Sequence, residues 1–363
     1  MEVATDSARI SLRNDYSEGA HPRLLQALAV ASAEINRGYG LDIHSARAAT
    51  LIRDRLGRDA DIHFLAGGTQ TNLVALAAFL RPHEAVIAPA SGHIATHETG
   101  AIEAGGHKVL TIATLDGKLS PELIQPCLDG HGSEHMVKPR LVYISNTTEW
   151  GTQYSAAELQ ALGAFCRDRD LLLYVDGARL ASALTTPGND VDLALLSTEA
   201  DAFYIGGTKN GSLLGEALVI VNPALRTDFR HVIKQRGAML AKGMVVGAQF
   251  EALFEDGLYF VLATHANAMA ARLREILQQA GVPLAVDSPS NQVFPILPDA
   301  VVERLGQYVE FETWERRSDG TTVIRLMASW ATPESDIEAF AATFSALYPE
   351  DPASQTASQA QGA

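Results

Sequence analysis

The chain has 363 residues, 47% of them hydrophobic and 20% charged, and a formal net charge of −15 at pH 7. Such a length predicts about two domains with a sizeable core, and an acidic balance without basic stretches argues against a nucleic-acid partner. The two cysteines are too few for a disulfide framework or a zinc site, so we expect no bound metal. No apolar run is long enough to span a membrane, and the chain does not open with a secretory pattern. We therefore expect a cytoplasmic protein.

Up to about residue 245, short apolar runs alternate with amphipathic helical patterns. Helices are expected at 69–80 and 156–169, and strands at 61–68, 84–89, 107–114, 141–148, 171–178, 202–207 and 215–221. Near-continuous apolar runs separated by helices favour a mostly parallel sheet covered on both faces, which is an α/β architecture. We assign residues 45–245 to this large domain.

The pattern changes after residue 245. One long helical segment is expected over 247–281, followed by strands at 291–298, 308–314 and 321–329 and a last helix at 334–349. This mixed order predicts a smaller α+β domain at 246–348, against which residues 1–44 pack. The polar, alanine-rich tail at 349–363 is predicted to be disordered.

Polar residues collect where several predicted strands end, and ligands of open α/β sheets bind at that edge. Gly68 and Thr69 lie in a glycine turn that begins a helix, where free N–H groups can hold a phosphate, although a plain turn also explains them. His93 follows the next strand, where a core histidine bonded to the backbone is the alternative. Asp176 ends a strongly apolar strand, either as a helix cap or as a carboxylate beneath a cationic heteroaromatic ring.

Lys209 stands in a turn of glycines and small polar residues between two predicted strands. A solvated turn lysine is one interpretation. The other is a nucleophile, whose pKa must be lowered by partial burial or nearby charge, as such a turn can provide.

These residues together resemble the fold-type I pyridoxal phosphate enzymes. The segments RNDYSEGAHPRLL, GYGLD, GGTQTN, SGHIATHETGA, YVDGARL, GGTKNGSLLGEA and RGAMLAKG, in this order, are similar to the threonine aldolase and β-eliminating lyase family. Within it they resemble the low-specificity L-threonine aldolase branch, which includes phenylserine aldolases. The resemblance runs from about Ser11 to about Tyr348 and implies a large cofactor domain and a smaller C-terminal domain.

The resemblance implies roles for the residues around the cofactor. Lys209 forms the Schiff base with pyridoxal 5'-phosphate, and Asp176 keeps its pyridine nitrogen protonated, so that the ring accepts electrons. The phosphate is cradled by Gly68, Thr69 and Gln70.

The resemblance also implies roles around the substrate. His93 stacks on the cofactor ring near the β-hydroxyl, while Arg179 and Arg325 hold the substrate carboxylate. Arg179 is also expected among the cofactor-binding residues, and Tyr39 among the substrate-binding ones. Arg325 could instead pair with an acidic neighbour, and Tyr39 could simply be a packing residue. In the family, the counterparts of Tyr39 and Lys242 reach across a dimer interface, Lys242 towards the phosphate, so we expect a homodimer or homotetramer in which residues 1–44 contribute to that interface.

The implied reaction cleaves a β-hydroxy-α-amino acid, a small-molecule substrate, to glycine and an aldehyde. β-Elimination, racemisation and transamination on the same fold stay open, as does a binding protein that has lost catalysis. The chain departs from some threonine aldolases because it has no histidine between Asn146 and Ser155. Glu149, or a water ordered by His93, is then expected to take the hydroxyl proton.

Overall fold

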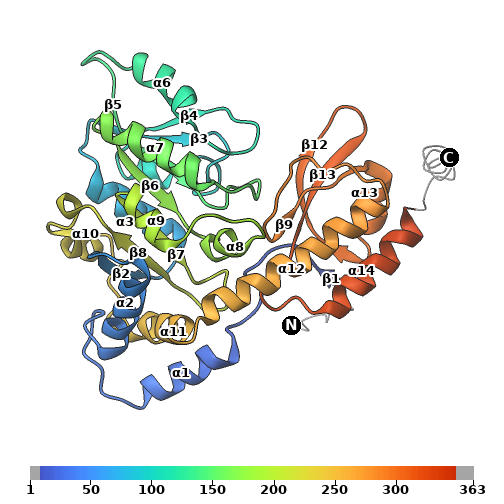
Figure 1. The fold of residues 1–363 in the computed structure, drawn as a ribbon, viewed down its shortest axis with the longest axis horizontal. Coiled ribbons are helices and arrows are strands. Elements are labelled where there is room, and N and C mark those ends of the chain that lie inside the picture. Colours follow the sequence, from blue (N-terminus) through green and yellow to red (C-terminus); the bar gives the residue numbers. More distant parts are fainter. Residues whose placement is uncertain (1–8, 349–363) are drawn as a thin grey trace.

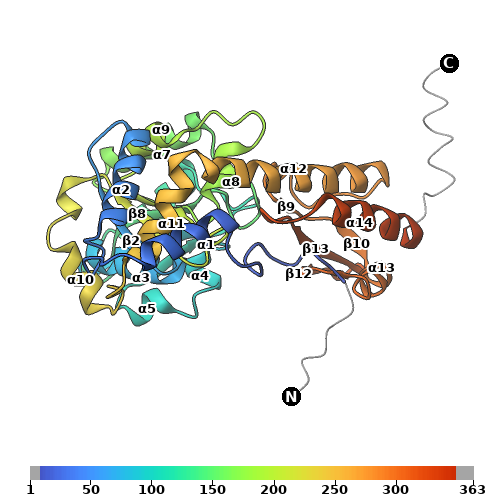
Figure 2. The ribbon, with the colours of Figure 1, turned by 90° about the horizontal axis from the view of Figure 1, so that it is seen from below.

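The computed structural model describes residues 9–348, so the predicted disordered tail lies outside the described residues. The described chain has a larger part built on a seven-stranded sheet and a smaller part built on short strands and helices (Figure 1). A view turned by 90° shows helix α12 (Leu258–Gln279) running from one part into the other (Figure 2). The predicted α/β class is confirmed.

The large sheet is mostly parallel, as the sequence predicted. Its strands are β2 (Asp61–Leu65), β3 (Glu84–Pro89), β4 (Val109–Ile112), β5 (Lys138–Ser145), β6 (Leu172–Asp176), β7 (Ala202–Gly206) and β8 (Glu216–Ile220). They lie in the order β2-β8-β7-β6-β5-β3-β4, in which β8 runs opposite to the other strands and so pairs antiparallel with β2 and β7. Strands β3, β6 and β7 are buried along their whole length, which explains their continuous apolar sequences.

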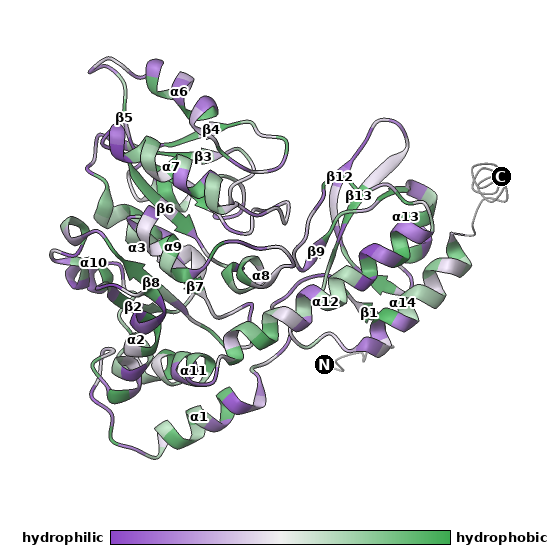
Figure 3. Cartoon of the chain, viewed as in Figure 1, coloured by the Kyte–Doolittle hydropathy of each residue, from purple (hydrophilic) through white to green (hydrophobic). Residues whose placement is uncertain are grey.

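Helices cover both faces of this sheet because alternate strand residues point to opposite sides. On β5, Val142 and Ile144 belong to one apolar cluster, whereas Leu141 and Tyr143 belong to the other. Figure 3 shows the apolar strands between the helix layers. The first face packs against α1 (Pro22–Ser32), α2 (Ile43–Leu56), α6 (Pro121–Asp129), α7 (Ala156–Asp168), α8 (Leu180–Thr185), α9 (Leu193–Glu199) and α11 (Met244–Glu255), the second against α3 (Gly68–Phe79), α4 (His93–Thr96), α5 (Ala101–Ala104), a 3-10 turn (Pro223–Leu225) and α10 (Phe229–Gln235).

The prediction of one long helical segment over 247–281 is wrong, because two separate helices occupy this stretch. α11 ends at Glu255 and α12 begins at Leu258, with Gly257 between them at a φ of 70°. This left-handed conformation costs glycine little and interrupts the helix. The early residues of α12 pack into the first apolar cluster, and those from Met269 onward pack into the core of the smaller part.

The smaller part is built from residues near both ends of the described chain. It contains β9 (Gln292–Val293), β10 (Ile296–Pro298), β12 (Glu312–Arg316) and β13 (Thr321–Met327) in one antiparallel arrangement, with α13 (Asp299–Leu305) and α14 (Glu334–Leu347). The early strand β1 (Ile10–Ser11) pairs in parallel with β11 (Val309–Glu310). The predicted domain limits at residues 44, 245 and 348 stay a prediction.

Candidate active site

Asp176, at the end of β6, is buried among hydrogen-bond donors. Its Oδ2 accepts from the Tyr143 hydroxyl at 2.6 Å and from Asn72 Nδ2 at 3.0 Å, and its Oδ1 accepts from the Tyr204 hydroxyl at 2.5 Å. Burial alone would raise the pKa of this carboxyl, but the charge of His93 and these donors hold it below its usual value. The carboxylate is therefore ionised at neutral pH and fixed in orientation, as pairing with a cationic ring nitrogen requires.

Lys209 lies partly buried in the turn between β7 and β8. Glu216 holds this turn by accepting hydrogen bonds from the Gly207 N–H at 3.0 Å and the Thr208 hydroxyl at 2.8 Å. Burial and the charge of Arg179 lower the pKa of Lys209, although nearby carboxylates act in the opposite direction. A lowered pKa leaves more of the amine unprotonated, which a lysine nucleophile needs.

His93 begins α4 and is positioned by two glutamates. Its Nδ1 lies 2.8 Å from Glu98 Oε1, and its backbone N–H donates to Glu149 Oε1 at 2.9 Å. Asn72 Nδ2 donates both to Glu98, at 2.8 Å, and to Asp176, so His93 and Asp176 belong to one hydrogen-bond network. The His93 side chain stays 33% exposed, which leaves part of its ring open towards a ligand.

Arg179 forms a buried ion pair that the sequence analysis did not anticipate. Its Nε and Nη2 donate to the two oxygens of Asp15 at 2.7 and 3.0 Å, and Asn291 Nδ2 donates to Asp15 at 3.0 Å. Burial would raise the pKa of Asp15, but the charges of Arg179 and Lys209 and these hydrogen bonds lower it to about 2. The predicted hold of Arg179 on a substrate carboxylate stays a prediction, and it would use the remaining nitrogen, Nη1.

Arg325, on β13, is a cation with an unsatisfied donor. Its guanidinium carbon lies 4.9 Å from the centre of the Trp314 ring, its Nη2 is 4.0 Å from Glu312 Oε2, and its buried Nε has no hydrogen-bond partner among residues 9–348. Burial and the charge of Arg179 lower the pKa of Arg325 to about 10, so it remains charged at neutral pH. A buried unsatisfied N–H on a cation suits an anionic ligand group.

The first turn of α3 contains the predicted phosphate-binding residues. Gly68 begins the helix, Thr69 is exposed, and Gln70 Oε1 accepts the Ala66 N–H at 3.1 Å. The first N–H groups of a helix have no partner within it, so they are available to an anion. A Cβ at position 68 would lie only 3.0 Å from the Tyr204 hydroxyl, so glycine keeps this space open.

These residues fit the pyridoxal phosphate that the resemblance implies. The turn at Gly68 offers N–H donors for a phosphate, the anchored Asp176 carboxylate suits a protonated ring nitrogen, and Lys209 offers an amine of lowered pKa for an aldehyde. Among the residues described, no group of three or more His, Cys, Asp or Glu side chains is placed to hold a metal ion.

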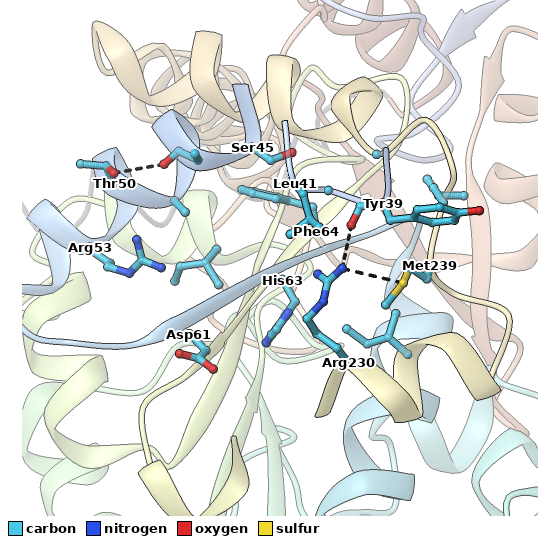
Figure 4. A pocket seen from close by; sticks show the side chains of 17 residues that line it. Tyr39, Leu41, Ser45, Thr50, Arg53, Asp61, His63, Phe64, Arg230 and Met239 are labelled. Atoms are coloured by element: carbon cyan, nitrogen blue, oxygen red, sulfur yellow. Dashed lines mark hydrogen bonds between the residues drawn. The ribbon is translucent and has the colours of Figure 1, made fainter. Parts of the chain in front are cut away.

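Tyr39 and Lys242 do not join this cluster within one chain. The Tyr39 N–H donates to the carbonyl of Ala241, the neighbour of Lys242, at 3.0 Å, and this bond links the two loops. Arg230 Nη2 donates to the Tyr39 carbonyl at 3.0 Å. Tyr39 and Arg230 border a pocket of about 400 Å³ between α2, β2 and α10 (Figure 4). Over residues 9–348, no hydrogen bond or ion pair joins the side chain of Tyr39 or Lys242 to Asp176 or Lys209.

Sequence reasoning missed the residues that support the site. Asp15 precedes Arg179 by 164 residues, so no local pattern links the two, although RNDYSEG was among the segments carrying the resemblance. Asn72 lies in the GGTQTN segment, but its contact with Asp176 depends on the packing of α3 against the sheet. Tyr143 and Tyr204 lie on apolar strands, where their sequence predicts only core packing.

Comparisons with known proteins agree with this geometry. The model of the beta-eliminating lyase family matches residues 12–299. The low specificity L-threonine aldolase of a Pseudomonas species is 33% identical over 347 residues, covering 94% of this chain and 99% of that protein. The structure of Leishmania major threonine aldolase is 51% identical, with a TM-score of 0.92 over 93% of this chain and 99% of that one. The fold is shared with Thermus thermophilus aspartate aminotransferase, which is 17% identical, with a TM-score of 0.71 over 94% of this chain and 92% of that one.

Proposed function

The chain belongs to the beta-eliminating lyase family, and from this premise we propose that it is a pyridoxal-phosphate-dependent lyase of the threonine aldolase type. Its substrates are L-threonine, L-allo-threonine or related β-hydroxy-α-amino acids, including phenylserine. The enzyme cleaves their Cα–Cβ bond and releases glycine and an aldehyde, which is acetaldehyde for threonine and benzaldehyde for phenylserine.

The arrangement of Asp176 and Lys209 is the observation that carries this proposal. Asp176 is kept ionised by three side-chain donors, and Lys209 has a lowered pKa in a turn held by Glu216. A helix cap would not need that set of buried donors, and a solvated turn lysine would not have its pKa lowered by burial.

Each part of the cofactor has candidate partners in this chain. We assign its aldehyde to Lys209, its ring nitrogen to Asp176, its phosphate to Gly68 and Thr69, and one ring face to His93. When bound, pyridoxal phosphate supplies an electron sink for the electron pair that bond cleavage leaves on Cα.

The side chains around this cofactor site orient the substrate and assist cleavage of its Cα–Cβ bond. Arg325 and Nη1 of Arg179 hold the carboxylate, a task suited to planar guanidinium donors. That hold directs the Cα–Cβ bond so that it can break when a base removes the β-hydroxyl proton. The aldehyde leaves, and Cα takes up a proton to give glycine.

A product assay tests this function. We expect the holoenzyme to convert L-threonine to equal amounts of glycine and acetaldehyde without ammonia, with Lys209→Ala protein as the inactive control. Ammonia and 2-oxobutanoate without glycine would instead identify a β-eliminating lyase. A visible absorption band that shifts when an amino acid is added, without any product, would identify a binding protein.

We also infer that the working unit is at least a dimer whose subunits share their sites. Among residues 9–348, no hydrogen bond or ion pair joins Lys242 or the half-exposed Tyr39 to Lys209, which supports a role for both in a neighbouring site. Several large apolar side chains between the start of α1 and the start of α2 are also exposed, as expected of a segment that contributes to an association surface. They are Leu25, Val30, Ile35, Leu41 and Ile43.

A further inference from the structure

Cleavage of a β-hydroxy amino acid needs a base for the hydroxyl proton, and most carboxylates of the site are already engaged. Asp15 binds Arg179, and Asp176 accepts from several donors. Glu149 is buried, and its Oε1 accepts from the Ser145 hydroxyl at 2.8 Å as well as from the His93 N–H that begins α4. Its Oε2 has no hydrogen-bond partner among residues 9–348, but the contacts of Oε1 hold Glu149 against the first residue of α4, and its burial raises the pKa of the carboxyl.

Building on the proposed function, we propose that His97 is the catalytic residue that accepts the β-hydroxyl proton. His97 directly follows α4, and its backbone N–H donates to the His93 carbonyl at 2.9 Å. The ring centres of His97 and His93 lie 5.5 Å apart. The cofactor-stacking residue assigned above therefore has a second imidazole beside it.

The small part of the molecule brings Trp314 and Arg325 towards His97. The His97 ring lies 6.5 Å from that of Trp314 on β12, and Trp314 in turn stacks under the Arg325 guanidinium. Ring contacts thus link His97 directly to the histidine assigned to the cofactor ring and, through Trp314, to the arginine assigned to the substrate carboxylate. A substrate held by both would place its β-carbon near this imidazole.

The imidazole of His97 is also free to act as a base. It is exposed, and neither ring nitrogen forms a hydrogen bond within the described chain. Burial of part of the ring and the charges of His93 on α4, Arg325 on β13 and Lys209 lower its pKa below 6.5, while Glu312 on β12 acts in the opposite direction. At neutral pH His97 is therefore mostly unprotonated, as proton removal requires.

The chemical step balances with these groups. The His97 imidazole takes the hydroxyl proton, and the O–H electron pair forms the carbonyl bond of the aldehyde. The Cα–Cβ bond breaks, with its electron pair left on Cα. Protonation of Cα gives glycine, and the imidazolium returns its proton to solvent.

The test compares two reactions of the holoenzyme that differ in their need for this base. Cleavage of L-threonine requires removal of a hydroxyl proton, whereas exchange of the glycine α-proton with D2O, followed by NMR, does not. Replacing His97 by glutamine should lower kcat for cleavage by about 10²–10⁴-fold and change glycine exchange little. His135→Gln, at an exposed histidine in the loop between α6 and β5, is the matched control and should leave both rates unchanged.

Two further measurements separate a base from a structural residue. The acidic limb of the kcat/KM profile for threonine should have a pKa below the ordinary histidine value and should disappear in His97→Gln protein. Added imidazole should restore cleavage by His97→Ala protein. Normal cleavage by the glutamine variant, equal loss of both reactions, or failure of rescue would overturn the inference. Wild-type protein that exchanges glycine but cleaves no β-hydroxy amino acid would overturn the proposed function itself.

Discussion

Replacing Asp15 by asparagine should destabilise the protein much more than the same change in an exposed ion pair. Asp15 is 1% exposed and bonds Arg179 through both oxygens. Although burial raises its pKa, the charges of Arg179 and Lys209 bring it from 3.8 to about 2. At 1.36 kcal/mol per pKa unit, the ionised carboxylate contributes roughly 2 kcal/mol to the free energy of unfolding.

This contribution depends on pH in a defined direction. Because the folded pKa of Asp15 is depressed, the stabilisation is complete above the unfolded pKa near 3.8 and is lost as the pH falls towards 2. At pH 7 the asparagine variant also leaves the Arg179 guanidinium buried without its counter-charge, and breaking a buried pair in this way costs about 3–5 kcal/mol. Both figures describe the same Asp15–Arg179 interaction and are not added, so the expected loss is about 2–5 kcal/mol.

The assay is urea unfolding of the cofactor-free protein at pH 7, followed by tryptophan fluorescence. Asp170→Asn is the control, because Asp170 binds Arg140 at a similar distance of 2.8 Å but its side chain is 82% exposed. That change should cost less than about 1 kcal/mol. Adding Arg179→Met to Asp15→Asn should recover part of the lost stability, since the unpaired charge is then removed. Equal transition midpoints for the two asparagine variants, or no recovery, would refute the reasoning.

Four other predictions concern catalysis. Lys209→Ala should abolish turnover while the circular dichroism spectrum stays native, and a comparable kcat with cofactor bound would rule out the assigned lysine. Asp176→Asn should reduce kcat by orders of magnitude more than it reduces cofactor affinity, measured by absorbance titration; a rate near wild type would return Asp176 to a capping role. Arg325→Ala should raise KM for amino acids by an amount equivalent to roughly 2–5 kcal/mol, whereas an equal loss on an amino alcohol without a carboxylate would argue against that contact. Mixing inactive Lys209→Ala and Lys242→Ala subunits should restore activity approaching about a quarter of wild type, because half of random dimers are mixed and each has one intact site; mixed dimers proven by mass spectrometry but inactive would exclude shared sites.

The sheet could be predicted from the sequence because its parallel strands are buried on both faces. Strands β3 and β7 appear as uninterrupted apolar runs, and each is followed by polar residues at the edge where ligands bind. The break between α11 and α12 escaped prediction because apolar periodicity continues across Gly257. A glycine within a helical pattern does not reveal its φ angle.

The residues expected to bind the cofactor were predicted from the sequence, but the residues that hold them in place were not. Asp176 and Lys209 were identified through their positions after strands and through family resemblance. The ion pair of Asp15 with Arg179 was missed because two residues so distant in the chain meet only when the sheet is assembled. His97 was missed because an exposed histidine after a short helix has no distinctive pattern in one sequence.

The pairing of β1 with β11 has a consequence for how the protein is made. Its hydrogen-bonded side chains include Ser11 and Glu310, which are separated by 299 positions. Closing so long a loop adds little to the equilibrium cost, since that cost grows only with the logarithm of length. On the ribosome, however, the amino-terminal strand must wait for its partner until nearly the whole described chain has been synthesised. Asp15 also waits for Asn291, so we expect the large sheet to fold first and a competent active site to form only after translation is almost complete.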